Sequence, residues 1–181
     1  MEKKSKTGKI LLCIIIILII LLLAGAAAWW IFMTPGYITR GQAVSNYYAS
    51  ISNEDKELYK NACYTKEWQE GYINGEAAIG IDAAIDVSFE FQSGASYGEV
   101  EVTALEKMDK EYADKLKDTV KNLYNVDMPV SALSKVNFTI KTSFEGAKEN
   151  SGTLTRYAYQ SRGKWYFLVD PETLVLMDLE G

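Results

Sequence analysis

An apolar segment close to the N-terminus constrains this chain more than any other feature. Residues 10–33 have the sequence ILLCIIIILIILLLAGAAAWWIFM, in which no side chain is charged. At about 1.5 Å of rise per residue, a helix of this length extends about 36 Å, which exceeds the roughly 30 Å of a bilayer's hydrocarbon core. The segment therefore predicts a transmembrane helix, and the membrane is the partner that residues 10–33 are expected to bind.

The charges that flank this segment predict its orientation. Four lysines precede it, and the first cation after it is Arg40. Because cytoplasmic flanks are enriched in lysine and arginine, we expect the N-terminus inside the cell and the C-terminal domain outside, on a single-pass protein of the cell membrane. The expected organisation is a basic cytoplasmic tail at 1–9, a signal anchor at 10–33, a linker at 34–38 and an extracytoplasmic domain at 39–181.

A cleaved secretory signal is the alternative interpretation of the same segment. The basic start, the apolar run and Ala26-Ala27-Ala28 also fit a signal peptide with a small-residue cleavage site. The apolar run continues to Met33, which is longer than a signal peptide requires, so an uncleaved anchor is favoured. In both interpretations the domain leaves the cytoplasm.

Composition excludes several functions for that domain. The chain has a net charge of -5, and residues 1–33 hold four lysines and one glutamate, so the remainder carries -8. Such a domain should be repelled by nucleic acid, and no nucleic-acid partner is expected. The absence of histidine excludes Ser-His-Asp and Cys-His catalysis and His-ligated zinc. No metal site and no cofactor are predicted, and the single Cys63 is expected on the buried face of a helix.

Helical spacing of apolar residues predicts three further helices. Thr39 and Gln42 have the spacing of a capping box, which predicts a helix starting there. A second helix is expected from about residue 54, capped at Ser52-Asn53 and interrupted near Tyr64-Thr65. The predicted helices lie at residues 39–51, about 54–70 and 107–124.

Alternation of apolar and polar residues predicts antiparallel strands. The longest alternating run extends from Ile79 to Gln92, with apolar residues at the odd positions. For the tail, residues 174–181, we expect either a short edge strand or an irregular cap. The other predicted strands lie at about residues 99–104, 136–144, 153–160 and 164–169.

The resulting order of helices and strands resembles the nuclear transport factor two-like superfamily. The closing stretch SGTLTRYAYQSRGKWYFLVDP is similar to the final hairpin of exported bacterial members, with Gly163-Lys164-Trp165-Tyr166 ahead of Asp170. This resemblance covers roughly residues 38–172. It implies an α+β fold in which a curved antiparallel sheet forms a cone packed against about three helices, in a membrane-anchored bacterial protein.

The predicted function is non-catalytic binding of a protein, peptide or envelope component by an anchored extracytoplasmic module. The alternative is a small-ligand or isomerase-like pocket within the cone, because some members of the superfamily use Asp and Tyr there. Alternation directs Asp82 and Asp86 away from the core, which counts against catalysis. The candidate pocket residues are Tyr47, Tyr48, Asp82, Asp86 and Trp165.

The predicted orientation can be tested with a reporter fused after Gly181. We expect activity from a reporter enzyme that works only outside the cytoplasm, because the lysines before the span keep the N-terminus inside and place the C-terminus outside. Activity in the cytoplasm would overturn the orientation. A mature chain whose N-terminus is Trp29 would instead identify the segment as a cleaved signal.

Overall fold

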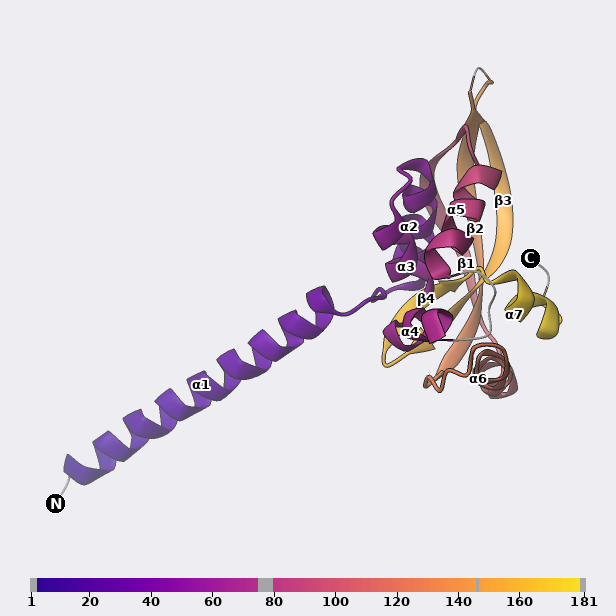
Figure 1. Cartoon of the computed structure of the whole chain (residues 1–181). Coiled ribbons are helices and arrows are strands. Elements are labelled where there is room, and N and C mark those ends of the chain that lie inside the picture. The colour runs from indigo at the N-terminus through magenta and orange to yellow at the C-terminus, as the bar shows by residue number, and fades with distance from the viewer. Residues whose placement is uncertain (1–2, 75–79, 146, 180–181) are drawn as a thin grey trace. The chain divides into compact units, whose positions relative to one another are not determined.

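The chain divides into two compact units, Met1–Thr34 and Pro35–Gly181. The first holds α1 (Lys3–Met33), whose window Leu12–Trp29 is exposed, and long and apolar enough to cross a membrane, a criterion that a signal sequence also satisfies (Figure 1). The computed structural model describes residues 3–74, 80–145 and 147–179, with side chains described for 12–29, 34–71, 80–145 and 147–179.

The second unit is an α+β domain, as the sequence predicts. Its described strands form one open antiparallel sheet in the order β1-β2-β3-β4. Its elements are α2 (Arg40–Ser52), α3 (Lys56–Cys63), α4 (Lys66–Asn74), α5 (Ile81–Phe91), β1 (Ala95–Lys107), α6 (Lys110–Tyr124), β2 (Ala132–Phe144), β3 (Asn150–Ser161), β4 (Lys164–Leu168) and α7 (Pro171–Leu176).

The strand predicted from Ile79 to Gln92 is wrong, because Ile81–Phe91 forms the helix α5. Ile81 and Ile85 are buried there and Phe89 packs against the core. These side chains are spaced four residues apart, which places them on one face of a helix. Ile79 itself lies outside the described residues. Among the described residues the sheet accordingly has one strand fewer than predicted, and this segment contributes a helix instead.

The start of α2 is confirmed and the start of α3 is corrected. The Thr39 hydroxyl accepts from the Gln42 backbone N–H, and the Gln42 side chain accepts from the Thr39 N–H, each at 3.2 Å, which makes the predicted capping box. The α3 cap is not at Ser52-Asn53. It is Asp55, whose carboxylate accepts from the N–H of Leu58 at 2.9 Å.

Two other expectations about helices have different outcomes. The predicted interruption near Tyr64-Thr65 is confirmed, because α3 ends at Cys63 and α4 begins at Lys66. The tail adds no edge strand in its described part, which ends at residue 179. Its first part belongs to α7, where Pro171 occupies the first turn and the Asp170 carboxylate caps the helix by accepting from the Thr173 N–H at 2.9 Å.

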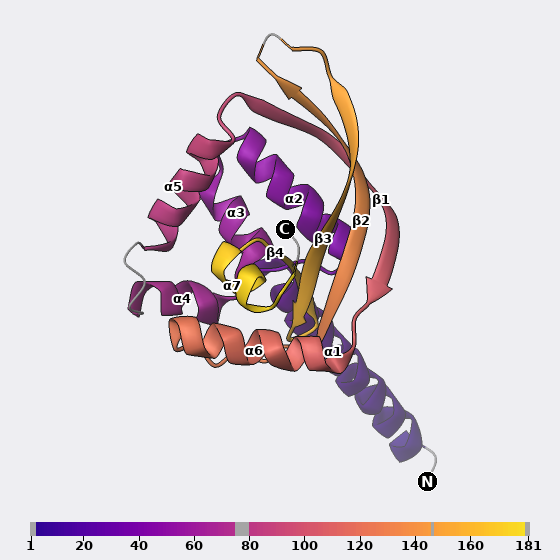
Figure 2. The same cartoon turned by 90° about the vertical axis from the view of Figure 1, so that its right-hand side faces the viewer.

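The helices pack against the sheet mainly through large apolar and aromatic side chains. α2 contacts β1 and β4, α3 contacts α2 and β4, and α6 contacts β2. Figure 2 shows α2 and α3 beside the sheet and α6 across one end of the strands. Cys63 is a buried free thiol, as its predicted position on the helix requires. The largest fully buried side chains include Trp68, Tyr159, Phe138, Phe167, Ile85 and Leu116.

A buried hydrogen bond joins the end of α6 to the start of α7. The hydroxyl of Tyr124 lies 2.8 Å from both carboxylate oxygens of Asp170. Tyr124 is 4% exposed and Asp170 is 3% exposed. Because water cannot replace a lost partner at this depth, the hydroxyl should contribute measurably to stability.

Replacing this hydroxyl tests the packing of the last helix. We expect Tyr124→Phe to lower the free energy of unfolding by about 1.5–3 kcal/mol, since it removes a buried hydrogen bond to a carboxylate. Urea unfolding of the full chain in mild detergent measures the change. The matched control is Tyr112→Phe, an exposed tyrosine on the same helix, which should leave the midpoint unchanged. Equal effects of the two substitutions would contradict the role of the bond.

Candidate functional site

A cavity of about 480 Å³ lies between α2 and the sheet and is the candidate functional site. It receives side chains from α2, the end of α5, the start of β1, β3, β4 and α7. Its walls combine apolar groups with phenols, one amide and one guanidinium. The lining residues are Tyr47, Tyr48, Gln92, Tyr97, Leu154, Arg156, Phe167, Leu168, Val169, Pro171 and Leu174.

Two adjacent tyrosines of α2 contribute to the cavity wall. The ring of Tyr47 lies 4.8 Å from that of Phe167, and the ring of Tyr48 lies 5.6 Å from that of Phe138, measured between centroids. These aromatic contacts fix both tyrosines against the sheet. Both belong to the apolar stripe that predicts the helix. One side of each ring packs against aromatic side chains of the sheet, and the other side lines the cavity.

Tyr97 reaches the cavity because its strand is irregular at that point. The register of β1 against β2 shifts between Tyr97 and Val100. The backbone N–H of Tyr97 donates to the hydroxyl of Ser52 at 2.9 Å, and its phenol donates to the side-chain oxygen of Gln92 at 2.7 Å. These two bonds tie the start of β1 to the ends of α2 and α5. Tyr97 is therefore held beside Tyr48, at 4.9 Å between ring centroids.

The phenols of the cavity are neutral hydrogen-bonding groups at physiological pH. Burial raises the pKa of Tyr48 to about 12, against the opposing effect of the positive charge on Arg156. Burial also raises the pKa of Tyr47, and more weakly that of Tyr97. Because the protonated form is favoured in each case, none of these hydroxyls can serve as a base near pH 7, and that of Tyr48 can donate to a ligand.

Arg156 is the one charged side chain among the described residues that line the cavity. It belongs to β3, where side chains alternate between the two faces, so it shares a face with Leu154. Sequence reasoning missed it. The available signal was its position in the strand-like segment TLTRYAYQ. Alternation places Arg156 on the same face of the strand as Leu154 and Ala158, and the threonines on the other face.

The structure brings together only some of the residues predicted for a pocket. Tyr47 and Tyr48 line the cavity, whereas Asp82, Asp86 and Trp165 do not. Among the described lining residues no carboxylate is present. Gln92 and Tyr97, like Arg156, were not predicted, because they come from separate elements that only the folded chain brings together.

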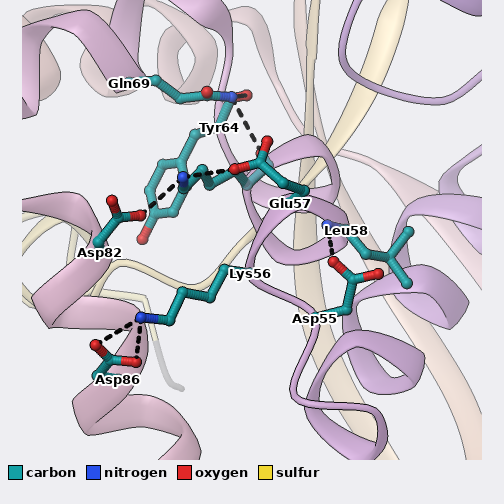
Figure 3. A network of polar contacts seen from close by, with 9 residues as sticks. Asp55, Lys56, Glu57, Leu58, Tyr64, Gln69, Asp82 and Asp86 are labelled. Atoms are coloured by element: carbon teal, nitrogen blue, oxygen red, sulfur yellow. Dashed lines mark hydrogen bonds and ion pairs between the residues drawn. The ribbon is translucent and has the colours of Figure 1, made fainter.

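Asp82 and Asp86 form ion pairs between α5 and α3 instead. Asp82 pairs with Lys60 at 2.7 Å, and Asp86 pairs with Lys56 at 2.6 Å (Figure 3). The two lysines are four residues apart and so are the two aspartates, so the charges of the two helices match in spacing. Lys60 also pairs with Glu57 at 2.8 Å. These aspartates therefore join two helices at the surface of the domain.

Trp165 has a structural position at the outer strand of the sheet. Its backbone exchanges two hydrogen bonds with Tyr37, at 3.0 and 2.7 Å, so the segment before α2 covers the edge of β4 there. The guanidinium of Arg40 lies 3.9 Å from the centre of the Trp165 ring, in a cation–π contact. Both contacts orient the start of α2 against the sheet.

The chemistry of the site has to be inferred from its own residues, because comparisons with family models, curated proteins and solved structures found no match. Within the described part of the chain, no group of three or more His, Cys, Asp or Glu side chains could hold a metal ion. The cavity offers hydrogen-bond donors, one positive charge and apolar contact area. This combination suits binding of a polar or anionic group joined to an apolar body.

The ion pair of Asp82 predicts a pH-dependent contribution to stability. A hydrogen bond from Lys60 holds the pKa of Asp82 below its usual value. Because the pKa is lower in the folded than in the unfolded state, the ionised carboxylate stabilises the domain. This contribution is complete above the unfolded-state pKa of about 3.9 and is lost as the pH falls through the folded-state pKa. We expect Asp82→Asn to cost under about 1 kcal/mol at pH 7, because the pair is largely exposed to solvent.

Urea unfolding of the wild type and Asp82→Asn between pH 3 and 7 measures this effect. The difference between the two stabilities should begin to shrink as the pH falls below about 3.9, because Asp82 becomes protonated first in the unfolded chain and only at lower pH in the folded domain. Asp118→Asn is the control, since Asp118 is exposed on α6 and makes no ion pair in the described part of the structure. A difference between wild type and Asp82→Asn that is as large at pH 3 as at pH 7 would contradict the assignment.

Proposed function

We propose that this protein is a membrane-anchored, extracytoplasmic binding module that recognises a protein, peptide or envelope component without catalysing a reaction. The cavity of about 480 Å³ carries this proposal, because it combines apolar walls with convergent hydrogen-bond donors. Its lining residues come from α2, β1, β3, β4 and α7, so a ligand there would contact several separate elements.

The absence of a carboxylate among the described lining residues favours binding over catalysis. General acid–base chemistry of the isomerase type needs a base near the reacting atom, and Asp82 and Asp86 are instead paired with Lys60 and Lys56. The phenols have raised pKa values and stay protonated near pH 7. A small-ligand pocket without chemistry is the second candidate function, and the cavity itself favours it.

The proposal includes membership of the nuclear transport factor two-like superfamily and a cone formed by the sheet and helices. Support comes from the antiparallel sheet against which α2 packs and from the final hairpin, β3 and β4, which contains the Gly163-Lys164-Trp165-Tyr166 motif. In a cone of this kind, the cavity between α2 and the sheet would lie inside. The helix α5 takes the place of the strand that the alternating pattern predicts.

Anchoring would give the binding module its mechanism. We place the N-terminus in the cytoplasm and the domain outside a bacterial cell, with α1 as an uncleaved anchor. A ligand or partner in the same membrane would then meet the domain at a high effective concentration. Under such conditions a cavity of modest intrinsic affinity is sufficient for stable engagement.

Site-specific photo-crosslinking in native membranes tests this proposal. A photoreactive phenylalanine analogue replaces Tyr97 at the cavity and, as the matched control, Tyr112 on α6. We expect a discrete adduct from position 97 and none of the same mass from position 112, because only the first side chain lines the cavity. Mass spectrometry identifies the adduct. Identical adducts from both positions, or none from position 97, would contradict binding at the cavity.

A further inference from the structure

The guanidinium of Arg156 has no carboxylate partner in the described structure, although the domain is acidic. Its Nη1 donates to the carbonyl of Thr155 at 2.8 Å, and the described residues provide no ion pair for it. A guanidinium has five N–H donors, so most of its hydrogen-bonding capacity remains for other acceptors. The cavity that it lines supplies no negative charge from its described residues.

The other two arginines of the chain are engaged by the protein itself. Arg162 forms an ion pair with Glu67 at 2.7 Å. Arg40 stacks on the ring of Trp165 and donates to the hydroxyl of Ser134 at 3.0 Å. A charged group that is partly removed from water is unfavourable unless it is paired. Arg156 is therefore the arginine best placed to gain from an incoming anion.

The groups around Arg156 determine which anion would fit. The nearby phenol of Tyr48 can donate a hydrogen bond, whereas the phenol of Tyr97 already donates to the Gln92 side chain at 2.7 Å. Leu154 and Phe167 provide apolar walls. One positive charge with neutral donors matches a monovalent carboxylate, whose two oxygens can accept both arms of a guanidinium. The apolar walls match a hydrophobic body attached to that carboxylate.

We propose that the cavity binds an organic carboxylate with an aromatic or aliphatic body, and that Arg156 holds the carboxylate. This inference rests on the proposed binding function and gives its ligand a chemical class. The carboxylate could belong to a free organic acid or to the C-terminal residue of a peptide, since both present the same group. The volume of about 480 Å³ admits either a small acid or a terminal residue with its side chain.

Matched pairs of acids and amides test this inference on the full chain in nanodiscs. The probes are 3-phenylpropionate against its amide for a free acid, and N-acetyl-Gly-Phe against its C-terminal amide for a peptide end. Isothermal titration measures each affinity. For the wild type we expect at least one acid to bind about tenfold more tightly than its amide, because only the acid forms charge-assisted hydrogen bonds. The pair that shows this preference identifies the source of the carboxylate.

Variants separate the role of Arg156 from general effects of charge. Arg156→Gln should bring acid and amide to within about twofold of each other, and Arg156→Lys should restore part of the preference, since it keeps the charge but not the fork. The control Arg162→Gln removes an arginine that lies outside the cavity and should keep the wild-type preference. Because all variants are measured in the same lipid, partitioning of probes into the bilayer cancels. Circular dichroism verifies that each variant is folded.

The outcomes distinguish this inference from the proposed function. Amides that bind the wild type as tightly as acids, or a preference that survives Arg156→Gln, would overturn the carboxylate assignment and leave cavity binding intact. Failure of all four probes would also overturn it, while an adduct at position 97 in native membranes would still support the function. Failure of the probes together with the absence of that adduct would overturn both.

Discussion

Two adjacent tyrosines of α2 make the contact on which the rest of this domain depends. Tyr48 packs its ring against Phe138 of β2, and Tyr47 packs against Tyr59 of α3, at 5.6 and 5.3 Å between centroids. Both also contact Phe167 of β4. Aromatic pairs of this kind contribute about 0.5–1.5 kcal/mol each beyond the area they bury. One turn of helix thus joins the helices to the sheet, and the same rings form a wall of the cavity.

The sequence predicts a helix or strand correctly where the spacing of apolar residues fits only one of the two. The segment at 81–91 permits two, because Ile81, Ile85 and Phe89 occupy odd positions of an alternating run and also one stripe of a helix. The decisive information lies in another part of the chain. Asp82 and Asp86 have the same four-residue spacing as Lys60 and Lys56, with which they pair. A helix places residues four apart one turn from each other, as the two lysines are on α3, whereas a strand would separate them by about 13 Å. The apolar pattern of residues 81–91 alone contains no information about the charges on α3.

The site is predictable from the sequence only where its residues share an element. Tyr47 and Tyr48 follow from the stripe of a single helix. Arg156 and Tyr97 enter the cavity through strand alternation and a register shift, so their proximity depends on tertiary structure. Trp165 shows the opposite error, because it is named as a pocket residue and does not line the cavity, and its backbone instead joins β4 to Tyr37.

Electrostatics also explains why a carboxylate site could exist on an acidic domain. Negative charges on the surface are screened beyond about 8–10 Å at physiological ionic strength, so they weaken the approach of an anion without deciding its binding. Inside the cavity, interactions are stronger because less water is present. Burial keeps the phenols of Tyr47 and Tyr48 neutral, so they add no negative charge beside Arg156. The preference for an anion would therefore be set by contacts within a few ångströms, where the described lining residues provide one positive charge and neutral donors.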